Sequence, residues 1–313
     1  MKHAIVAGIL SLCGGLTLQF FLIKLQRRFQ MTQVQKSYGV GIDVEVKGST
    51  PTMGGLVFMA TALVALGVRG GAEAFFFWAL PVAGGAIGFW DDWLKVSRKS
   101  SEGFTSLRKL GVQVVIALIW VIWASLRGKL ILWPGFEGPL WCVAPVVVVA
   151  AAGMMNAVNV TDGLDCLAGG AFFISLGVLS PLLVHVDFLF EVFAVLLGMI
   201  ASFLFYNVRP ARIFMGDTGS HFLGGALVAL CVQGDMIVAL IPAGFLFGIE
   251  LLSSALQIIA LRGFKRKIFR MAPLHHHFQR AGWDETTVTF RFLVVHAVGA
   301  ALTAALCVYL GYS

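Results

Sequence analysis

The chain has 313 residues, of which 58% are hydrophobic and only 12% are charged, and its net charge is +7 at pH 7. Ordinary soluble domains contain about 25% charged residues, so this composition excludes a water-soluble globular protein. Five scattered cysteines without a CxxC pair exclude a disulfide framework and a zinc ribbon.

Ten apolar segments are candidates for helices that cross the roughly 30 Å of membrane hydrocarbon. They fall at residues 4–23, 53–69, 73–90, 110–126, 139–157, 166–184, 188–206, 219–232, 236–261 and 290–310. The first is long for a signal peptide and is followed by Lys24, Arg27 and Arg28, so we expect a retained span. The sequence therefore predicts an all-α integral membrane protein of about ten transmembrane helices, with one domain over residues 1–313.

Basic residues are unevenly divided between the two sets of connecting loops. The loops at 24–52, 91–109, 158–165, 207–218 and 262–289 contain 18 Lys and Arg residues, whereas the opposite side holds four. The positive-inside rule predicts that the first set faces the cytoplasm and that both termini lie outside. Membrane topology and anionic lipids account for the net charge, so no nucleic-acid partner is predicted.

Polar residues cluster at the predicted cytoplasmic ends of the second and third segments. The stretch Lys47-Gly-Ser-Thr-Pro-Thr52-Met-Gly-Gly brings a cation, hydroxyls and flexible backbone to the second segment. The third ends in Asp91-Asp92-Trp-Leu-Lys95. Adjacent carboxylates ionise together only at a cost, so this pair indicates Mg²⁺ or a raised pKa. The alternative is a solvated helix end in which Lys95 pairs with the aspartates.

The fifth segment ends in four polar residues spaced three apart, namely Asn156, Asn159, Asp162 and Asp165. This spacing gathers side chains on one face of a tight helix and on a broader face of an α-helix. Helix capping explains one of them but hardly four. They predict a polar cluster at the cytoplasmic mouth of this segment.

The eighth segment is preceded by Phe214-Met-Gly-Asp217-Thr-Gly-Ser220. Asp217 can ligate a metal ion, and the glycines and the exposed N–H groups of a helix start suit a phosphate group. An ordinary helix N-cap is the alternative interpretation.

The most basic loop contains five cations between Arg262 and Arg270, followed by Met-Ala-Pro-Leu-His275-His276-His277-Phe. In an extended chain three consecutive histidines point to alternating sides, so they cannot jointly close one zinc site. Imidazoles beside cations favour a phosphate-bearing ligand. A loop bound only to lipid headgroups is the alternative.

Taken together, these motifs resemble the polyprenyl-phosphate N-acetylhexosamine-1-phosphate transferase superfamily, and within it the phospho-N-acetylmuramoyl-pentapeptide transferase family. The resemblance covers nearly the whole chain. It rests on Thr-Pro-Thr-Met-Gly-Gly from Thr50, Asp-Asp-x-x-Lys from Asp91, Asn-Ala-Val-Asn-Val-Thr-Asp-Gly-Leu-Asp from Asn156, Phe-Met-Gly-Asp-Thr-Gly-Ser from Phe214, and the run from Ile268 to Phe278. The last run separates the muramoyl branch from relatives that use N-acetylglucosamine phosphate.

The resemblance implies a Mg²⁺-dependent transferase of the bacterial plasma membrane with a cytoplasmic active-site cleft. Its donor would be UDP-N-acetylmuramoyl-pentapeptide and its acceptor undecaprenyl phosphate, giving lipid I and UMP for peptidoglycan synthesis. The implied catalytic residues are Asp91, Asp92, Asp217 and His276, with Asp217 as the metal ligand. The implied substrate-binding residues are Lys47, Thr52, Lys95, Lys109, Asn156, Asn159, Asp162, Gly163, Leu164, Asp165, Phe214, Ser220, Gln257, His275 and His277.

One segment departs from the family pattern, and two other functions remain open. Residues 37–46 lack the Ser-His-x-x-Lys run expected before the Thr-Pro-Thr motif, which leaves the contacts of that loop and the donor peptide preference open. The other functions are transfer from UDP-N-acetylglucosamine and secondary transport, although a transporter would carry its carboxylates at mid-span. The sequence does not choose between one-step transfer and a covalent aspartyl-phosphate. It also leaves the oligomeric state open, a homodimer included.

Overall fold

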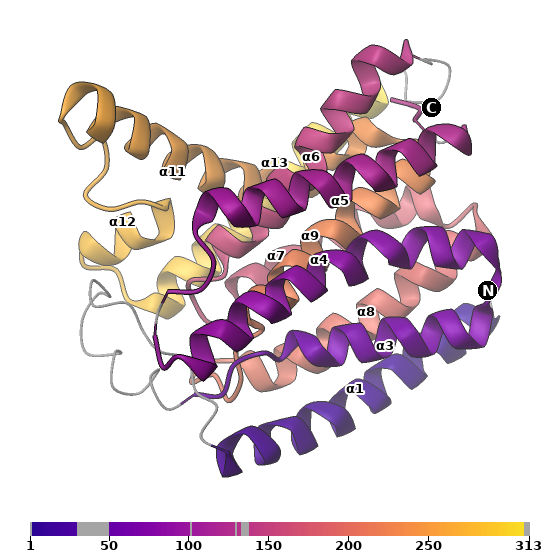
Figure 1. Ribbon diagram of the computed structural model, residues 1–313, viewed down its shortest axis with the longest axis horizontal. Coiled ribbons are helices and arrows are strands. Elements are labelled where there is room, and N and C mark those ends of the chain that lie inside the picture. The colour runs from indigo at the N-terminus through magenta and orange to yellow at the C-terminus, as the bar shows by residue number, and fades with distance from the viewer. Residues whose placement is uncertain (1, 30–49, 101, 129, 133–137, 310–313) are drawn as a thin grey trace.

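The computed structural model describes residues 2–29, 50–100, 102–128, 130–132 and 138–309 (Figure 1). Over these residues the chain is a bundle of helices without a β-strand element. Lys47 and segment 37–46, which the sequence analysis singled out, lie outside the described residues. The prediction of an all-helical chain is confirmed for the part that the structure describes.

Each predicted apolar segment overlaps a helix. These are α1 (Lys2–Arg28), α3 (Gly55–Arg69), α4 (Gly71–Ser97), α5 (Ser106–Leu126), α6 (Leu140–Thr161), α7 (Leu167–Leu183), α8 (Asp187–Asn207), α9 (Gly216–Gln233), α11 (Phe245–Phe264) and α13 (Glu285–Tyr309). Among the described residues, seven of them are long and apolar enough to cross a membrane, whereas α3 and α7 are shorter apolar helices. The chain is therefore a multi-pass membrane protein.

Two segments differ from their prediction. The ninth apolar segment, expected as one span over 236–261, begins with a 3-10 helix η1 (Ile237–Ala239) and a short α10 (Leu240–Ala243) before α11. The interruption coincides with Pro242 and Gly244, because proline lacks a backbone N–H and glycine adds conformational freedom. The basic loop contains a short helix α12 (Leu274–Arg280) where the sequence analysis assumed an extended chain.

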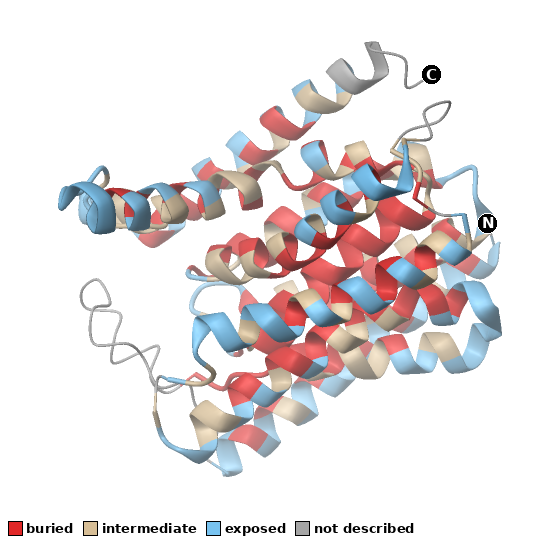
Figure 2. Cartoon of the chain, turned by 45° about the horizontal axis from the view of Figure 1, so that its top comes forward, coloured by how far each residue is buried: buried red, intermediate tan, exposed pale blue. Residues whose placement is uncertain are grey.

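Helix α9 is the centre of the bundle. Every residue from Asp217 to Gln233 is buried, and α3, α4 and α6 pack around it. Figure 2 shows the buried residues concentrated in the middle of the bundle and the exposed residues on its outer helices. A helix that is apolar on all sides requires neighbours on all sides. The polar start of α9 is consequently carried into the centre of the structure together with its apolar body.

Glycines allow neighbouring helices to approach the start of α9. A Cβ atom at Gly88 on α4 would overlap the carbonyl group of Asp217, and one at Gly55 on α3 would overlap the backbone of Gly219. Both contacts are backbone to backbone, so no side-chain rotation relieves them. These glycines therefore determine how closely the polar ends of α3, α4 and α9 meet.

Replacing Gly88 with alanine tests this close approach. The added methyl group must push α4 away from the Asp217 carbonyl, so we expect a loss of about 1–3 kcal/mol of stability and a lower melting temperature. Gly153→Ala on α6 is the matched control, since an added Cβ there meets nothing within 4 Å. Thermal unfolding of both variants in the same detergent is the measurement. Equal melting temperatures for wild type and Gly88→Ala would contradict the packing described.

Candidate active site

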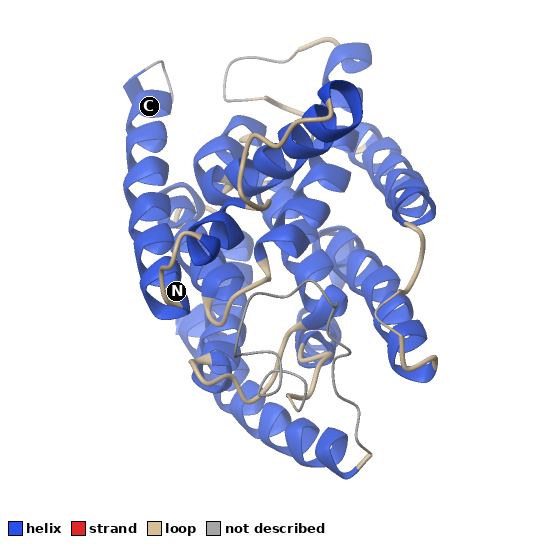
Figure 3. Cartoon of the chain, turned by 90° about the vertical axis from the view of Figure 1, so that its left-hand side faces the viewer, coloured by secondary structure: helices blue, strands red, loops and turns tan. Residues whose placement is uncertain are grey.

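Three carboxylates meet where α4 ends and α9 begins. Figure 3 views the bundle from the left-hand side of Figure 1, the side on which α12 lies. Asp91 and Asp92 lie near the C-terminal end of α4, and Asp217 lies in the first turn of α9. One oxygen from each carboxylate lies within 4.8 Å of those from the other two. All three residues are buried, Asp217 least completely. Carboxylates this close repel one another strongly unless positive charge is present.

Two lysines supply positive charge to the cluster. The Nζ atom of Lys95 lies 2.6 Å from Asp91 Oδ2 and 3.2 Å from Asp217 Oδ2. The Nζ atom of Lys109, on α5, lies 2.7 Å from Asp217 Oδ2 and 3.9 Å from Asp91 Oδ2. Three carboxylates and two ammonium groups leave one net negative charge when all are ionised. The cluster is therefore suited to bind a further cation.

Asp92 has a different environment from Asp91. Its Oδ1 accepts the backbone N–H of Asp217 at 3.1 Å, and its Oδ2 accepts the backbone N–H and the hydroxyl of Thr218 at 2.9 and 2.7 Å. These bonds satisfy N–H groups that a helix start leaves without partners, and the carboxylate is favoured by the helix dipole. Gly216 has φ +71°, and a Cβ there would meet the Asp92 carboxylate. The geometry thus makes Asp92 the cap that fixes Asp217.

Helix α6 contributes one member of its polar run to the cluster. The Nδ2 of Asn159 donates to Asp217 Oδ1 at 2.8 Å and to the Ser220 hydroxyl at 3.0 Å. Asn156 lies about one turn away and instead donates to Gln113 Oε1 at 2.6 Å. The structure therefore brings Asn159 and Ser220 to the carboxylates and places Asn156 in a separate polar contact between α5 and α6.

The loop between α6 and α7 is tied to α8 and α13. The backbone N–H of Asp165 donates to Glu285 Oε1 at 2.9 Å, and the other oxygen of Glu285 pairs with Arg209 at 2.7 Å. The N–H of Cys166 donates to Asn207 Oδ1 at 2.9 Å. The sequence analysis missed Asn207 and Glu285, because neither belongs to one of the predicted motifs and their partners are distant in sequence.

Within this loop the predicted substrate-binding residues differ in accessibility. Leu164 and Asp165 are buried, Asp162 is half-buried at the end of α6, and Gly163 is exposed. A carboxylate oxygen of Asp165 accepts the backbone N–H of Ala211 at 3.1 Å. A ligand that approaches this loop would meet Gly163 and Asp162 first.

The start of α3 packs against the segment that leads into α9. The N–H of Phe214 donates to the carbonyl of Pro51 at 2.9 Å, and the N–H of Gly54 donates back to the carbonyl of Phe214 at 2.8 Å. The buried Thr52 lies beside Gly216, since a Cβ on that glycine would be 3.1 Å from the Thr52 hydroxyl. Thr52 and Phe214 therefore flank the acidic cluster.

The three histidines lie on helix α12, which corrects the assumption of an extended chain. Successive side chains are about 100° apart on a helix rather than on alternating sides. The Nδ1 of His276 lies 2.7 Å from Gln279 Oε1, and the Nδ1 of His277 accepts the backbone N–H of Arg270 at 3.0 Å. The rings of His275 and His276 pack against each other with their centroids 4.2 Å apart, whereas the ring of His277 packs on Phe269. That the three histidines do not jointly bind zinc stays a prediction.

His275 forms a fully buried pair with Glu250 of α11. Glu250 Oε1 accepts the backbone N–H of His275, and its Oε2 lies 3.2 Å from Nδ1, which places the ring proton on Nδ1. The Nε2 atom faces Gly163, where an added Cβ would overlap it. His275 consequently connects α11, α12 and the α6–α7 loop. Sequence reasoning missed Glu250, although an ionisable residue inside an apolar segment is a signal in itself.

Gln257 holds the basic loop against α11. Its Oε1 accepts the N–H groups of Ile268 and Phe269 at 3.0 and 2.9 Å, and its Nε2 donates to the Phe269 carbonyl at 3.0 Å. Arg266 and Lys267 are exposed on this loop. The side chain of Gln257 is committed to the loop backbone, so in this structure it positions the loop.

Helix α13 starts with a cap that belongs to no predicted motif. Asp284 accepts the hydroxyl and the backbone N–H of Thr287 at 2.5 and 2.9 Å. These hydrogen bonds lower the pKa of the Asp284 carboxyl. The cap fixes the first turn of α13 and therefore the position of Glu285, which holds the α6–α7 loop.

Comparison with known proteins agrees with this arrangement. The family model described as glycosyl transferase family 4 matches residues 73–235, which include the carboxylate cluster. Three similar proteins are all named phospho-N-acetylmuramoyl-pentapeptide-transferase. The one from Desulforudis audaxviator is 37% identical over 96% of this chain and 97% of its own length. Those from Heliobacterium modesticaldum and a Nostoc species are 36% and 35% identical, over 96% and 92% of this chain and 97% and 82% of their own lengths.

The Glu250–His275 pair can be tested by Glu250→Gln. The amide keeps the size but offers one oxygen to two donors, so we expect a loss of about 1–3 kcal/mol in thermal stability. We also expect ¹⁵N spectra of histidine-labelled protein to show loss of the single Nδ1–H tautomer of His275. Glu191→Gln is the control, because Glu191 forms a partly exposed pair with Arg69 and such pairs contribute little. An unchanged tautomer together with an unchanged melting temperature would show that Glu250 does not orient the ring.

Proposed function

The chain belongs to glycosyl transferase family 4, among the phospho-N-acetylmuramoyl-pentapeptide transferases, and we propose that it transfers phospho-N-acetylmuramoyl-pentapeptide from its UDP donor to undecaprenyl phosphate. The products are lipid I and UMP. The observation that carries this proposal is the cluster of three carboxylates and two lysines, which lies within the region matched by the family model. Such a charge arrangement suits the joining of two phosphate-bearing substrates.

We further propose ten membrane crossings, with both termini outside and the active site in the cytoplasm. The distribution of basic residues supports this orientation. The short helix α9 needs no lipid-facing surface, because it is surrounded by other helices. The three carboxylates and α12 then lie at the cytoplasmic end, where the soluble donor has access.

The cofactor that we propose is Mg²⁺. Carboxylate oxygens are the ligands that it prefers, with phosphate oxygens of the substrate completing its coordination. Asp217 is the ligand that we propose, because its Oδ2 lies at the centre of the cluster beside both ammonium groups, and a bound ion would compete with them for that oxygen. Asp92 is committed to the start of α9. A bound ion would neutralise charge on the donor diphosphate.

The protein side chains then have separable tasks. Lys95 and Lys109 reach the centre of the cluster and can bind phosphate oxygens. Asp91 is held by the backbone N–H of Phe104 at 2.7 Å on one oxygen and faces Lys95 with the other. It is the carboxylate available to orient the lipid phosphate or to accept its last proton. Asn159 keeps Asp217 aligned from α6.

The residues around this centre suit the rest of the donor. We assign the nucleotide to the surface formed by Thr52, Phe214 and the α6–α7 loop, which flanks the carboxylates. The exposed Gly163 gives access to that loop. His276 and His277 on α12 would contact the donor from the other side of the loop.

Purified protein incubated with Mg²⁺, undecaprenyl phosphate and both UDP-sugars tests the function directly. We expect a lipid product with the mass of lipid I from the muramoyl-pentapeptide donor and none from UDP-N-acetylglucosamine. Asp217→Asn should lower turnover by several orders of magnitude, because metal-based charge stabilisation is worth several kcal/mol. Asp187→Asn, at the start of α8, is the control. A product from N-acetylglucosamine alone, or near-normal turnover of Asp217→Asn, would refute the assignment.

Cysteine labelling tests the orientation. In a chain whose native cysteines have been replaced, Glu102→Cys lies in the predicted cytoplasmic loop after α4, and Ala72→Cys lies at the opposite end of that helix. Both positions are exposed. A membrane-impermeant maleimide added to intact cells should label only position 72. Labelling of position 102 alone would invert the topology and remove the active site from the cytoplasm.

A further inference from the structure

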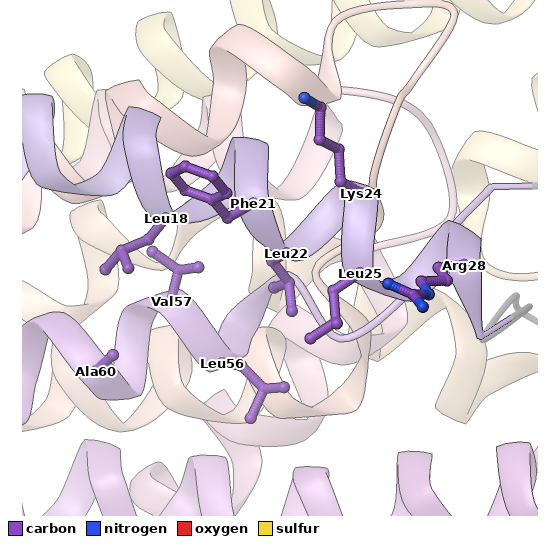
Figure 4. A pocket seen from close by; sticks show the side chains of 9 residues that line it. All are labelled: Leu18, Phe21, Leu22, Lys24, Leu25, Arg28, Leu56, Val57 and Ala60. Atoms are coloured by element: carbon purple, nitrogen blue, oxygen red, sulfur yellow. The ribbon is translucent and has the colours of Figure 1, made fainter.

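A groove of about 500 Å³ lies between α1 and α3, away from the carboxylate cluster (Figure 4). Its walls are mostly apolar and include Leu18, Leu22 and Leu25 of α1 and Val57 and Ala60 of α3. The two cationic lining residues, Lys24 and Arg28, belong to the C-terminal part of α1. An apolar channel with cations at one end matches a molecule with a hydrocarbon chain and an anionic head.

The groove follows from how α1 is packed. This helix rests mainly on α8, where a Cβ at Gly198 would overlap the backbone of Gly8 and one at Gly15 would meet Ser202. Toward α3 the contact is light, and a hydrogen bond from Gln19 to the Gly54 carbonyl at 3.1 Å joins α1 to the start of α3. The space between α1 and α3 is therefore left open on the side that faces the membrane.

Lys24 and Arg28 favour an anionic ligand in this groove. Lys24 and Arg28 are one helical turn apart and both exposed, and like charges at this spacing repel one another. In the part of the chain that the structure describes, neither is paired with a carboxylate, and the Nζ atom of Lys24 lies 4.2 Å from the centroid of the Phe20 ring. An anion bound beside the two side chains reduces the repulsion, and in a membrane the anion that comes with a hydrocarbon chain is a lipid phosphate.

We propose that the α1–α3 groove binds an anionic phospholipid, with one acyl chain along Leu18, Leu22 and Val57 and the phosphate at Lys24 and Arg28. None of the three carboxylates lines the groove, which separates this lipid from the acceptor substrate. The groove includes Leu56 and Val57, directly after Gly55, which packs on Gly219 beside the active site. The lipid thus supports the start of α3. The proposal requires membrane insertion but not the proposed transfer reaction.

Native mass spectrometry of the purified protein tests lipid binding without an activity readout. Phosphatidylglycerol and phosphatidylcholine with identical acyl chains are titrated onto the detergent-solubilised protein. We expect tighter binding of phosphatidylglycerol, and a roughly 25-fold loss in Lys24→Gln/Arg28→Gln, about fivefold for each basic side chain. Arg98→Gln/Lys99→Gln, an exposed basic pair at the end of α4, should retain the preference. Ala60→Phe fills the groove and should weaken binding of both lipids while the charges remain.

Three results would overturn the proposal. Equal affinity of the wild type for both lipids would show that the groove does not select an anionic head. Equal losses in the two double variants would show that surface charge alone attracts the lipid. If undecaprenyl phosphate displaces phosphatidylglycerol and Lys24→Gln/Arg28→Gln raises its KM in the transfer assay, the groove belongs to the acceptor instead.

Discussion

The arrangement of this protein depends on one constraint, which is that the fully buried helix α9 begins with a carboxylate. The apolar body of α9 requires neighbours on every side, and those neighbours bring Asp217 into a region of low polarity. An isolated buried charge costs far more than the helix gains by packing. The surrounding helices must therefore supply partners, and α4, α5 and α6 each contribute one or more.

These partners divide into groups that hold the backbone and groups that balance charge. The oxygens of Asp92 accept the first N–H groups of α9. Lys95 and Lys109 instead form ion pairs with Asp217 and Asp91. The two adjacent carboxylates of one motif thus have different roles: Asp92 binds backbone, and Asp91 pairs with Lys95. The difference follows from helix geometry, because neighbouring residues on α4 point about 100° apart, and only Asp92 accepts the backbone N–H groups at the start of α9.

Hydropathy was sufficient to predict the long helices, because the hydrocarbon thickness requires long apolar segments whatever their neighbours are. The motifs indicated which polar residues gather at one end of the bundle, but not which partner each of them contacts. Asn156 and Asn159 share a motif, yet one contacts Gln113 and the other Asp217, which depends on the rotation of α6 against α5 and α9. Glu250, Asn207 and Glu285 belong to none of the predicted motifs. Their partners are distant in sequence, so only the packed structure reveals them.

The outer part of the site is held by a different kind of interaction from its centre. Gln257 and Asn207 bind loop backbone with their side-chain amides, and Glu250 fixes both the backbone and the ring of His275. The amide hydrogen bonds contribute about 1 kcal/mol each and, together with the buried Glu250–His275 pair, set the shape of the loops, whereas the charges at the centre set the electrostatic potential of the site. Substitutions in the outer group should therefore weaken donor binding more than they slow the chemical step. Substitutions of Asp217 or Lys109 should slow the chemical step more than they weaken donor binding, since those charges matter most where charge is redistributed between two phosphates.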